Sequence, residues 1–333
     1  MSSRQNILLI RFKSIGDVVL TLPAAHVVRE NFPSAKITFL TSNENAPLLR
    51  GFRDVSEVIT LDRSALRSGN PLKMAGEFFG LSRRLRAGKF SLVVDFQGYG
   101  ETGWLARLTG APQRWGSVYG PGRAWVYTRG IQRNDRLHLA DWNLSLLEQC
   151  GLKMGRIQNE FDLPEEAVVE ARKFFPANNL DAARPTLFIQ PFTSSPQKNW
   201  PLENFLALAR YFQSRGTQIV FGGGPSEQGA LEPVRAAGFP ISAGMPLLTA
   251  AGVMRLSTVI IGGVTGLLHL AVALQKRVVM LVNSPATETG LPYQHKDWIV
   301  ATTDGAALSK LEPETVIAAC AQAFNESAGN ASC

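Results

Sequence analysis

Short apolar runs rich in β-branched and aromatic residues alternate along this chain with longer stretches in which apolar residues recur at helical spacing. In the first half, the apolar runs predict strands at residues 6–12, 35–41, 57–61 and 90–97. Between the first two runs, segment 17–32 has apolar residues every three to four positions, which predicts a helix. Pro23 lies inside this segment and predicts a kink or a local break.

The second half of the chain restarts the same alternation. Apolar runs predict strands at residues 185–192, 217–224, 257–263 and 277–282, and helical periodicity predicts helices at 202–215 and 265–275. Strands that alternate with helices are typical of βαβ units around a parallel sheet. The chain is therefore expected to be an α/β protein.

The length of 333 residues allows two domains, each with its own core. The charged segment 163–185, which contains Asn-Asn and ends on a proline, predicts the connection between them. We expect two Rossmann-like, doubly wound domains facing across a cleft, over residues 1–165 and 166–333. The last helix, at about 312–325, has the option of packing back on the first domain. In such sheets ligands bind beyond the carboxyl ends of the strands, so the loops after strands are the candidate sites.

The composition is that of a globular protein, with 45% apolar and 18% charged residues. No apolar run reaches the roughly 18 residues needed to span a bilayer, and the first run, residues 7–10, is too short for a signal peptide. The cysteines, Cys150, Cys320 and Cys333, lie far apart and lack the spacing of metal ligands. These features fit a reducing compartment and predict a cytoplasmic protein.

The net charge of +7 belongs entirely to the first half of the chain. Residues 1–150 hold 20 Lys and Arg against 12 Asp and Glu, whereas residues 151–333 hold 14 against 15. This asymmetry indicates an anionic partner of the first half, and a solvated basic face is the alternative. No interleaved aromatic and basic motif of the known nucleic-acid-binding kinds is found, so we expect no nucleic acid as partner.

The loop after the predicted strand 185–192 carries candidate phosphate ligands. Thr193 and Ser194 supply hydroxyls, Lys198 supplies an ammonium group, and a helix begins near Pro201. Hydroxyls, free backbone N–H groups and a lysine suit a diphosphate. A capped turn with a solvent-exposed lysine is the alternative.

Two further loops of the second half have the same character. Glu227 follows three glycines and suits the hydroxyls of a ribose, or is an ordinary first-turn acid favoured by the helix dipole. Thr265 and Gly266 begin the predicted helix 265–275, where backbone N–H groups suit an anion. His269 lies one turn further on, and a single histidine on an apolar helix is usually a core residue.

In the first half, Asp17 begins the helix after the first predicted strand. An acid in a first helical turn is stabilised by about 0.3–1 kcal/mol through the helix dipole and needs no catalytic role. However, Lys13 and Ser14 lie in the same loop, and Gly16 permits close approach of a sugar. The residues alone leave a structural acid and a catalytic base equally open.

Taken together, these loops resemble glycosyltransferase family 9, the bacterial heptosyltransferases of lipopolysaccharide core assembly. The resemblance covers nearly the whole chain, through the motifs "SIGDVVLTLPA", "FTSSPQKNWP", "FGGGPSE" and "GGVTGLLHLAVAL" in the family's order. It implies the GT-B fold, with the acceptor bound by the first domain and an ADP-activated heptose by the second. It further implies transfer with inversion at the anomeric carbon, without an essential metal or a cofactor.

The resemblance also implies roles for residues. Asp17 matches the general base that takes the proton of the acceptor hydroxyl. The residues that match donor contacts are Thr193, Ser194, Lys198, Glu227, Thr265, Gly266 and His269. Val264, however, stands where the family motif has an acid. The alternative function is therefore a non-catalytic or altered-donor GT-B protein that binds a nucleotide or a glycolipid.

The basic first half then has an expected partner in the phosphates and acidic sugars of lipid A and the inner core. Lys13, Ser14, Arg63 and Arg67 are the candidate acceptor-binding residues. This acceptor implies a cytoplasmic protein in peripheral contact with the inner membrane surface.

Overall fold

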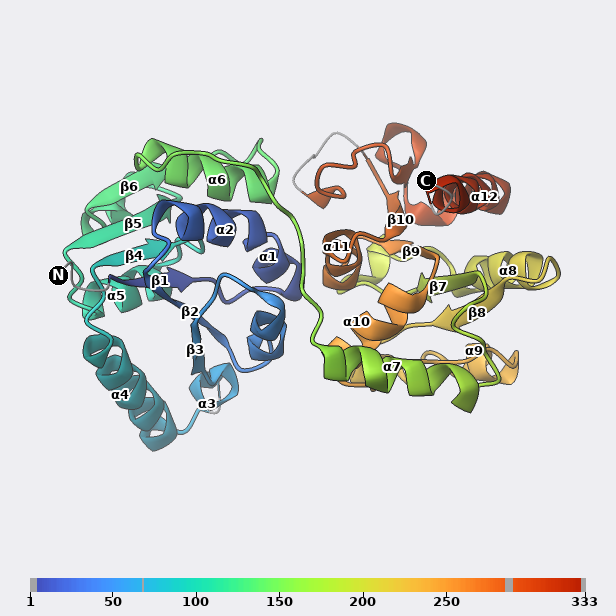
Figure 1. Ribbon diagram of the computed structural model, residues 1–333, viewed down its shortest axis with the longest axis horizontal. Helices are drawn as coiled ribbons and strands as arrows, with labels where there is room; N and C mark the ends of the chain where they lie inside the picture. The colour runs from blue at the N-terminus through green and yellow to red at the C-terminus, as the bar shows by residue number, and fades with distance from the viewer. Residues whose placement is uncertain (1–4, 68, 285–289, 331–333) are drawn as a thin grey trace. The chain divides into compact units, whose positions relative to one another are not determined.

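The computed structural model describes residues 5–67, 69–284 and 290–330. The chain forms two compact units, Met1–Glu160 and Phe161–Cys333. Each unit is a parallel sheet with helices on both faces (Figure 1). The α/β class expected from the sequence is confirmed.

The first sheet has the strand order β3-β2-β1-β4-β5-β6, and its neighbouring strands are parallel. Its strands are β1 (Asn6–Ile10), β2 (Lys36–Ser42), β3 (Glu57–Leu61), β4 (Leu92–Asp95), β5 (Gln113–Val118) and β6 (Arg129–Gln132). The first four lie where alternating apolar runs predicted them. β5 and β6 carry polar and basic side chains, so they lack the apolar pattern that identified the others.

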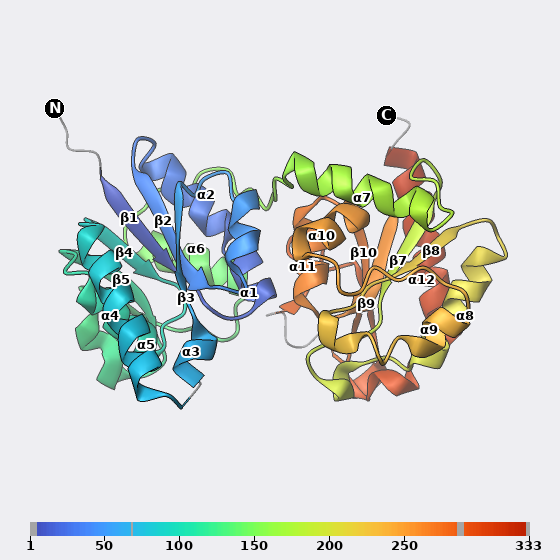
Figure 2. The ribbon, with the colours of Figure 1, turned by 90° about the horizontal axis from the view of Figure 1, so that it is seen from below.

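Helices cover both faces of the first sheet. Those of this unit are α1 (Ile15–Val19), α2 (Leu22–Asn31), α3 (Arg63–Arg67), α4 (Pro71–Ala87), α5 (Gly100–Leu108), α6 (Leu139–Gln149) and the 3-10 turns η1 (Ala46–Gly51) and η2 (Pro121–Val126). α2 packs with α6, while α4 packs with α5 against a different part of the core (Figures 1 and 2). The helix expected over 17–32 is broken in two, and Pro23 lies at the start of α2, as predicted.

The second sheet has the order β11-β10-β9-β7-β8, again with parallel neighbours. Its strands are β7 (Thr186–Gln190), β8 (Gln218–Phe221), β9 (Val259–Gly263), β10 (Arg277–Val282) and β11 (Ile299–Ala301). β11 has only three residues, too few to show a period.

The helices of the second unit are α7 (Glu165–Ala177), α8 (Leu202–Gln213), α9 (Glu232–Ala236), α10 (Leu247–Leu256), α11 (Gly266–Ala273) and α12 (Pro313–Asn330), with the 3-10 turns η3 (Pro196–Lys198), η4 (Pro225–Glu227), η6 (Thr303–Gly305) and η7 (Leu308–Lys310). Much of the segment 163–185 expected to be a connection is α7, which packs against α10. α12, for which contact with the first domain was an option, buries Val316, Cys320 and Ala323 in the core of its own unit.

Burial also affects the cysteines. Cys150 and Cys320 are free thiols inside the two units, and burial raises the pKa of the Cys150 thiol to about 11. Cys333 lies outside the described residues.

Within the described ranges, none of the helices combines the length and the apolar character needed to cross a bilayer.

Candidate functional site

The first sheet changes direction between β1 and β4, since the chain crosses from β1 to β2 on one side and from β4 to β5 on the other. Ligands of doubly wound sheets bind at such a point. The side chain of Gln97 joins the loops that follow β1 and β4, because its Oε1 accepts hydrogen bonds from the backbone N–H groups of Phe12 and Lys13, both at 3.2 Å. The edge therefore holds the segment that leads to Asp17 in a fixed path.

Asp17 lies in the first turn of α1 and forms an ion pair with Arg11. The distance from Arg11 Nη2 to Asp17 Oδ2 is 2.8 Å, and the two side chains are 5% and 33% exposed. Arg11 also donates to the carbonyl oxygens of Phe96 at 2.6 Å and Lys13 at 3.2 Å. A buried cation thus orients a carboxylate that still reaches solvent, an arrangement suited to a base.

Three candidate acceptor residues lie at the same edge of the sheet. The Lys13 ammonium is exposed and lies 5.1 Å from the centre of the Tyr99 ring. Ser14 is the N-cap residue of α1, and its hydroxyl makes no capping bond. Arg63 begins α3 after β3, which is two strands from β1. Arg67 ends α3, and its side chain lies outside the described part of the chain.

A buried carboxyl group supports the loop after β4. Asp95 is 0% exposed and accepts hydrogen bonds from Gln97 N–H, Gly98 N–H and the Tyr127 hydroxyl, the last at 2.6 Å. Burial raises the pKa of this carboxyl, and the Tyr127 hydrogen bond opposes the rise. Sequence reasoning missed Asp95, Gln97 and Arg11, although an aspartate that ends an apolar strand was a usable signal.

In the second sheet the corresponding change of direction lies between β7 and β9. Thr193 follows β7, and its hydroxyl donates to Ser195 O at 2.8 Å while accepting from Ser195 N–H at 3.2 Å. The backbone N–H of Thr193 donates to Asn199 Oδ1 at 2.8 Å. The Thr193 hydroxyl therefore shapes the turn on which Ser194 and Lys198 are exposed.

The loops after β7 and β9 touch each other and border a cavity. A Cβ added at Gly263 would lie 2.6 Å from Thr193 Cγ2, so only glycine allows this approach. Lys198 and Val264 both line a cavity of about 450 Å³, together with Ser195, Gln197, Val282, Asn283, Ser284, Gly290 and Leu291. The cavity is therefore lined both by the Lys198 ammonium and by Val264, which stands where the family motif has an acid. Residues 285–289, between Ser284 and Gly290, lie outside the described residues.

Helix α11 begins at this cavity edge. Thr265 is its N-cap residue and accepts a hydrogen bond from Leu268 N–H at 3.3 Å, and Gly266 is its first residue. His269 lies in α11 and is only 6% exposed. This burial agrees with the alternative that His269 is a core residue. The Thr265 hydroxyl therefore already has a structural task in capping.

Glu227 closes a turn after β8. Its Oε2 accepts from Gly224 N–H at 2.7 Å, so the carboxylate caps η4. This hydrogen bond supports the alternative that Glu227 is a structural acid of a first helical turn.

Gln190 ends β7 and was not identified from the sequence. It is 3% exposed, and its Nε2 donates to Phe192 O at 3.3 Å. Its Oε1 has no hydrogen-bond partner among the described residues. A buried acceptor without a donor is costly, so Gln190 lowers the stability of this edge of the sheet.

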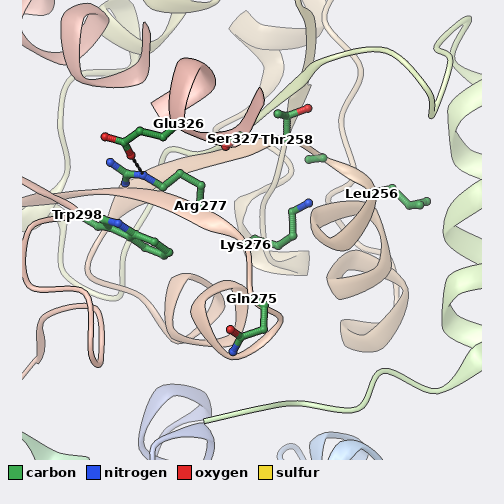
Figure 3. A pocket seen from close by; sticks show the side chains of 9 residues that line it. Leu256, Thr258, Gln275, Lys276, Arg277, Trp298, Glu326 and Ser327 are labelled. Atoms are coloured by element: carbon green, nitrogen blue, oxygen red, sulfur yellow. Dashed lines mark hydrogen bonds and ion pairs between the residues drawn. The ribbon is translucent and has the colours of Figure 1, made fainter. Parts of the chain in front are cut away.

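A cavity of about 660 Å³ lies at the amino ends of β9 and β10, the end opposite to the candidate site (Figure 3). Arg277 lies 4.7 Å from the centre of the Trp298 indole and pairs with Glu326 at 2.7 Å. Burial, with help from the charge of Arg255, lowers the pKa of Lys276 to about 8. None of the predicted site residues lines this cavity.

Comparison with known proteins gives one matching family. The model of glycosyltransferase family 9 (heptosyltransferase) matches residues 78–317. Lipopolysaccharide heptosyltransferase 3 of Escherichia coli K12 is 24% identical over 214 residues, which span 63% of this chain and 61% of that protein. Lipopolysaccharide heptosyltransferase 1 of Pseudomonas aeruginosa is 24% identical over 277 residues, 80% of this chain and 76% of that protein.

Solved structures show the same fold. A family 9 glycosyltransferase from Veillonella parvula superposes with a TM-score of 0.85 at 23% identity, covering 98% of this chain and 99% of its own. An E. coli heptosyltransferase solved with ADP superposes with a TM-score of 0.78 at 21% identity, covering 96% and 100%. The GT-B architecture expected from the sequence is confirmed.

Proposed function

Because the chain belongs to glycosyltransferase family 9, we propose that it transfers a heptose or a related sugar from an ADP-activated donor to a lipopolysaccharide core acceptor, with inversion at the anomeric carbon. The observation that carries this proposal is the pairing of Asp17 with buried Arg11 on the loop after β1. The named relatives support the substrate classes, since both are lipopolysaccharide heptosyltransferases.

The first unit binds the acceptor in this proposal. Lys13 and Arg63 supply positive charge near the loop after β1, which suits an acceptor with phosphates or acidic sugars. Ser14 offers a hydroxyl that makes no capping bond. Because lipopolysaccharide precursors are amphiphilic, we place the reaction at the cytoplasmic face of the inner membrane.

The second unit binds the donor. Lys198 lines the cavity of about 450 Å³ beside the start of α11, where the N–H groups of a helix N-terminus favour an anion. The diphosphate is assigned to Thr193, Ser194, Lys198, Thr265 and Gly266, the ribose side to Glu227, and the sugar side to Val264 and His269.

The chemistry follows from these roles. The acceptor hydroxyl oxygen attacks the anomeric carbon from the face opposite the diphosphate, and its proton passes to an Asp17 oxygen. The bond from the anomeric carbon to the diphosphate oxygen breaks, and ADP leaves with the electron pair. Lys198 and the α11 N–H groups stabilise the charge that develops on the leaving oxygen.

The test measures ADP release from ADP-heptose with a truncated lipopolysaccharide acceptor. Asp17→Asn should lower kcat by about 10²–10⁴-fold. Asp141→Asn is the matched control, because Asp141 also lies in a first helical turn but belongs to α6. Full activity of Asp17→Asn would exclude Asp17 as the base.

One observation favours a second candidate, a protein that binds a nucleotide or a glycolipid without turnover or with another donor. Val264 removes the motif acid from the wall of the Lys198 cavity. Nucleotide binding without ADP release from any nucleotide sugar would favour this candidate.

A further inference from the structure

Three neighbouring elements of the first unit expose large apolar side chains. They come from α4, α5 and η2 and are Leu72, Met74, Phe78, Phe79, Trp104 and Trp125, here called the α4 surface. Leu72 is 83% exposed, Phe79 71% and Trp125 61%. α4 and α5 pack side by side (Figure 2). Several large exposed apolar side chains on neighbouring elements are typical of a binding surface.

The exposed stripe of α4 changes from apolar to basic along the helix. Leu72, Phe79, Arg83 and Arg86 recur at spacings of seven, four and three, so they share one helix face. α4 as a whole carries Lys73, Arg83, Arg84 and Arg86 against the single acid Glu77. A helix with exposed aromatics and a basic end is typical of helices that lie in a membrane interface.

Two residues of the α4 surface, Phe78 and Trp104, lie near the segment that leads to Asp17. Phe78 and Trp104 line an apolar groove of about 530 Å³ with Phe12, Leu61, Leu81, Glu101, Leu105 and Leu108. Phe12 immediately precedes Lys13 and Ser14. A surface that covers Phe78 and Trp104 therefore lies beside the loop proposed to meet the acceptor.

We propose that the α4 surface docks on an anionic lipid bilayer, with Leu72 and Phe79 inserted among acyl chains and Arg83 and Arg86 against lipid phosphates. This proposal identifies the part of the chain that contacts the membrane. It rests on the proposed function in one respect only, namely that a protein docked on the bilayer meets an acceptor held in the same bilayer. Charge complementarity selects this occupant. A second copy of the chain would bring one basic stripe against another, which is repulsive.

The first test is flotation with vesicles of phosphatidylcholine, with and without phosphatidylglycerol. The wild-type protein should bind the anionic vesicles, and the double variant Leu72→Ser/Phe79→Ser should bind about tenfold more weakly. Val169→Ser is the matched control, because Val169 is 44% exposed on α7 of the other unit. Equal binding of the double variant and the control would overturn the proposal.

The basic end of α4 has its own test. Arg83→Gln and Arg86→Gln should each weaken binding to anionic vesicles by about fivefold and leave binding to neutral vesicles unchanged. Arg172→Gln, an exposed position on α7, is the matched control. The proposal fails if salt and these substitutions leave vesicle binding unchanged.

Two further measurements distinguish a bilayer from a second copy of the chain, and docking from catalysis. Light scattering should find the same mass for the wild type and for Leu72→Ser/Phe79→Ser. If the wild type is a dimer and the variant a monomer, the surface binds a second copy of the chain.

Transfer to a deacylated, water-soluble acceptor should be unchanged in the variant. If the wild-type protein transfers the sugar but does not bind vesicles, the docking is refuted and the proposed function stands. If it binds vesicles but transfers no sugar, the docking stands and the proposed function is refuted.

Discussion

Arg11 Nη2 lies 2.8 Å from Asp17 Oδ2, and Arg11 belongs to the core while a third of the Asp17 side chain reaches solvent. The guanidinium also binds the carbonyls of Phe96 and Lys13, so it ties together the loops after β4 and β1. One buried cation therefore fixes both the direction of the carboxylate and the path of the backbone around it.

This double role predicts an order of stabilities. Arg11→Met removes all three interactions and should lower the free energy of unfolding by about 2–4 kcal/mol. Asp17→Asn should cost less, because the amide oxygen still accepts from Arg11 Nη2. Urea denaturation of the two variants and of the exposed control Arg156→Met measures the order. Greater destabilisation by Asp17→Asn would mean that the carboxylate, not the cation, holds the loops.

Gln97 offers a test of loop position without a change of charge. Its Oε1 accepts from the backbone N–H groups of Phe12 and Lys13. Gln97→Ala should lower kcat by about tenfold or more through misplacement of Asp17, with little change in the donor KM. Gln149→Ala, at the end of α6, is the control. A change in the donor KM alone would place the effect elsewhere.

The fold was largely predictable because buried parallel strands have simple sequences. β1 and β7 are largely apolar runs, and this pattern alone predicts that they are buried strands. β5 and β6 did not show this pattern because polar and basic residues interrupt them. α7 was mistaken for a connection, although Ala171 and Phe175 are buried at helical spacing, because its charged residues dominate the segment.

The candidate site was predictable only where a motif carried it. Asp17 and Lys198 were identified by position after a strand, and the structure places both at carboxyl ends of strands. Arg11, Gln97 and Gln190 were missed, since their roles depend on which loops meet in space. That information lies in the strand order and not in the local sequence.

Val264 predicts a change in donor preference. It shares a cavity wall with Lys198, so Val264→Asp adds a hydrogen-bond acceptor and a negative charge where sugar hydroxyls are proposed to lie. The ratio of kcat/KM for ADP-heptose over other ADP-sugars should rise by about tenfold. Val264→Leu keeps the wall apolar and is the control. An unchanged ratio would remove Val264 from the donor site.

Asp95 predicts a pH-dependent stability. Burial raises its pKa above the unfolded value of 3.8, so this carboxyl destabilises the fold increasingly as pH rises through the shifted value. Tyr127→Phe removes a hydrogen bond that favours the ionised form of Asp95, so the variant should lose more stability than the wild type as pH rises through the range in which Asp95 ionises. Tyr119→Phe, at a 40% exposed position, is the control. A loss of stability that does not change with pH in urea denaturation of the two variants would contradict a role for Tyr127 in stabilising the ionised carboxylate.

Lys276 predicts a stabilising substitution at a position outside the candidate site. Its pKa falls from 10.5 to about 8 because it is buried, and Arg255 adds like charge. Figure 3 shows the side chain among the residues that line the cavity at the amino ends of β9 and β10. Below pH 8 the ammonium is charged in both states, so the folded protein carries the full cost of burying it.

Lys276→Met should therefore raise the free energy of unfolding at pH 7 by about 1 kcal/mol, after allowance for solvent at the cavity rim. The gain should shrink as pH rises from 8 to 10.5, because the native lysine loses its proton before the unfolded one. Thermal unfolding of variant and wild type across this range measures the difference. Lys173→Met, at an exposed α7 position paired with Glu170, should show no such gain. A loss of stability at pH 7 would mean that bound anions compensate the charge of Lys276.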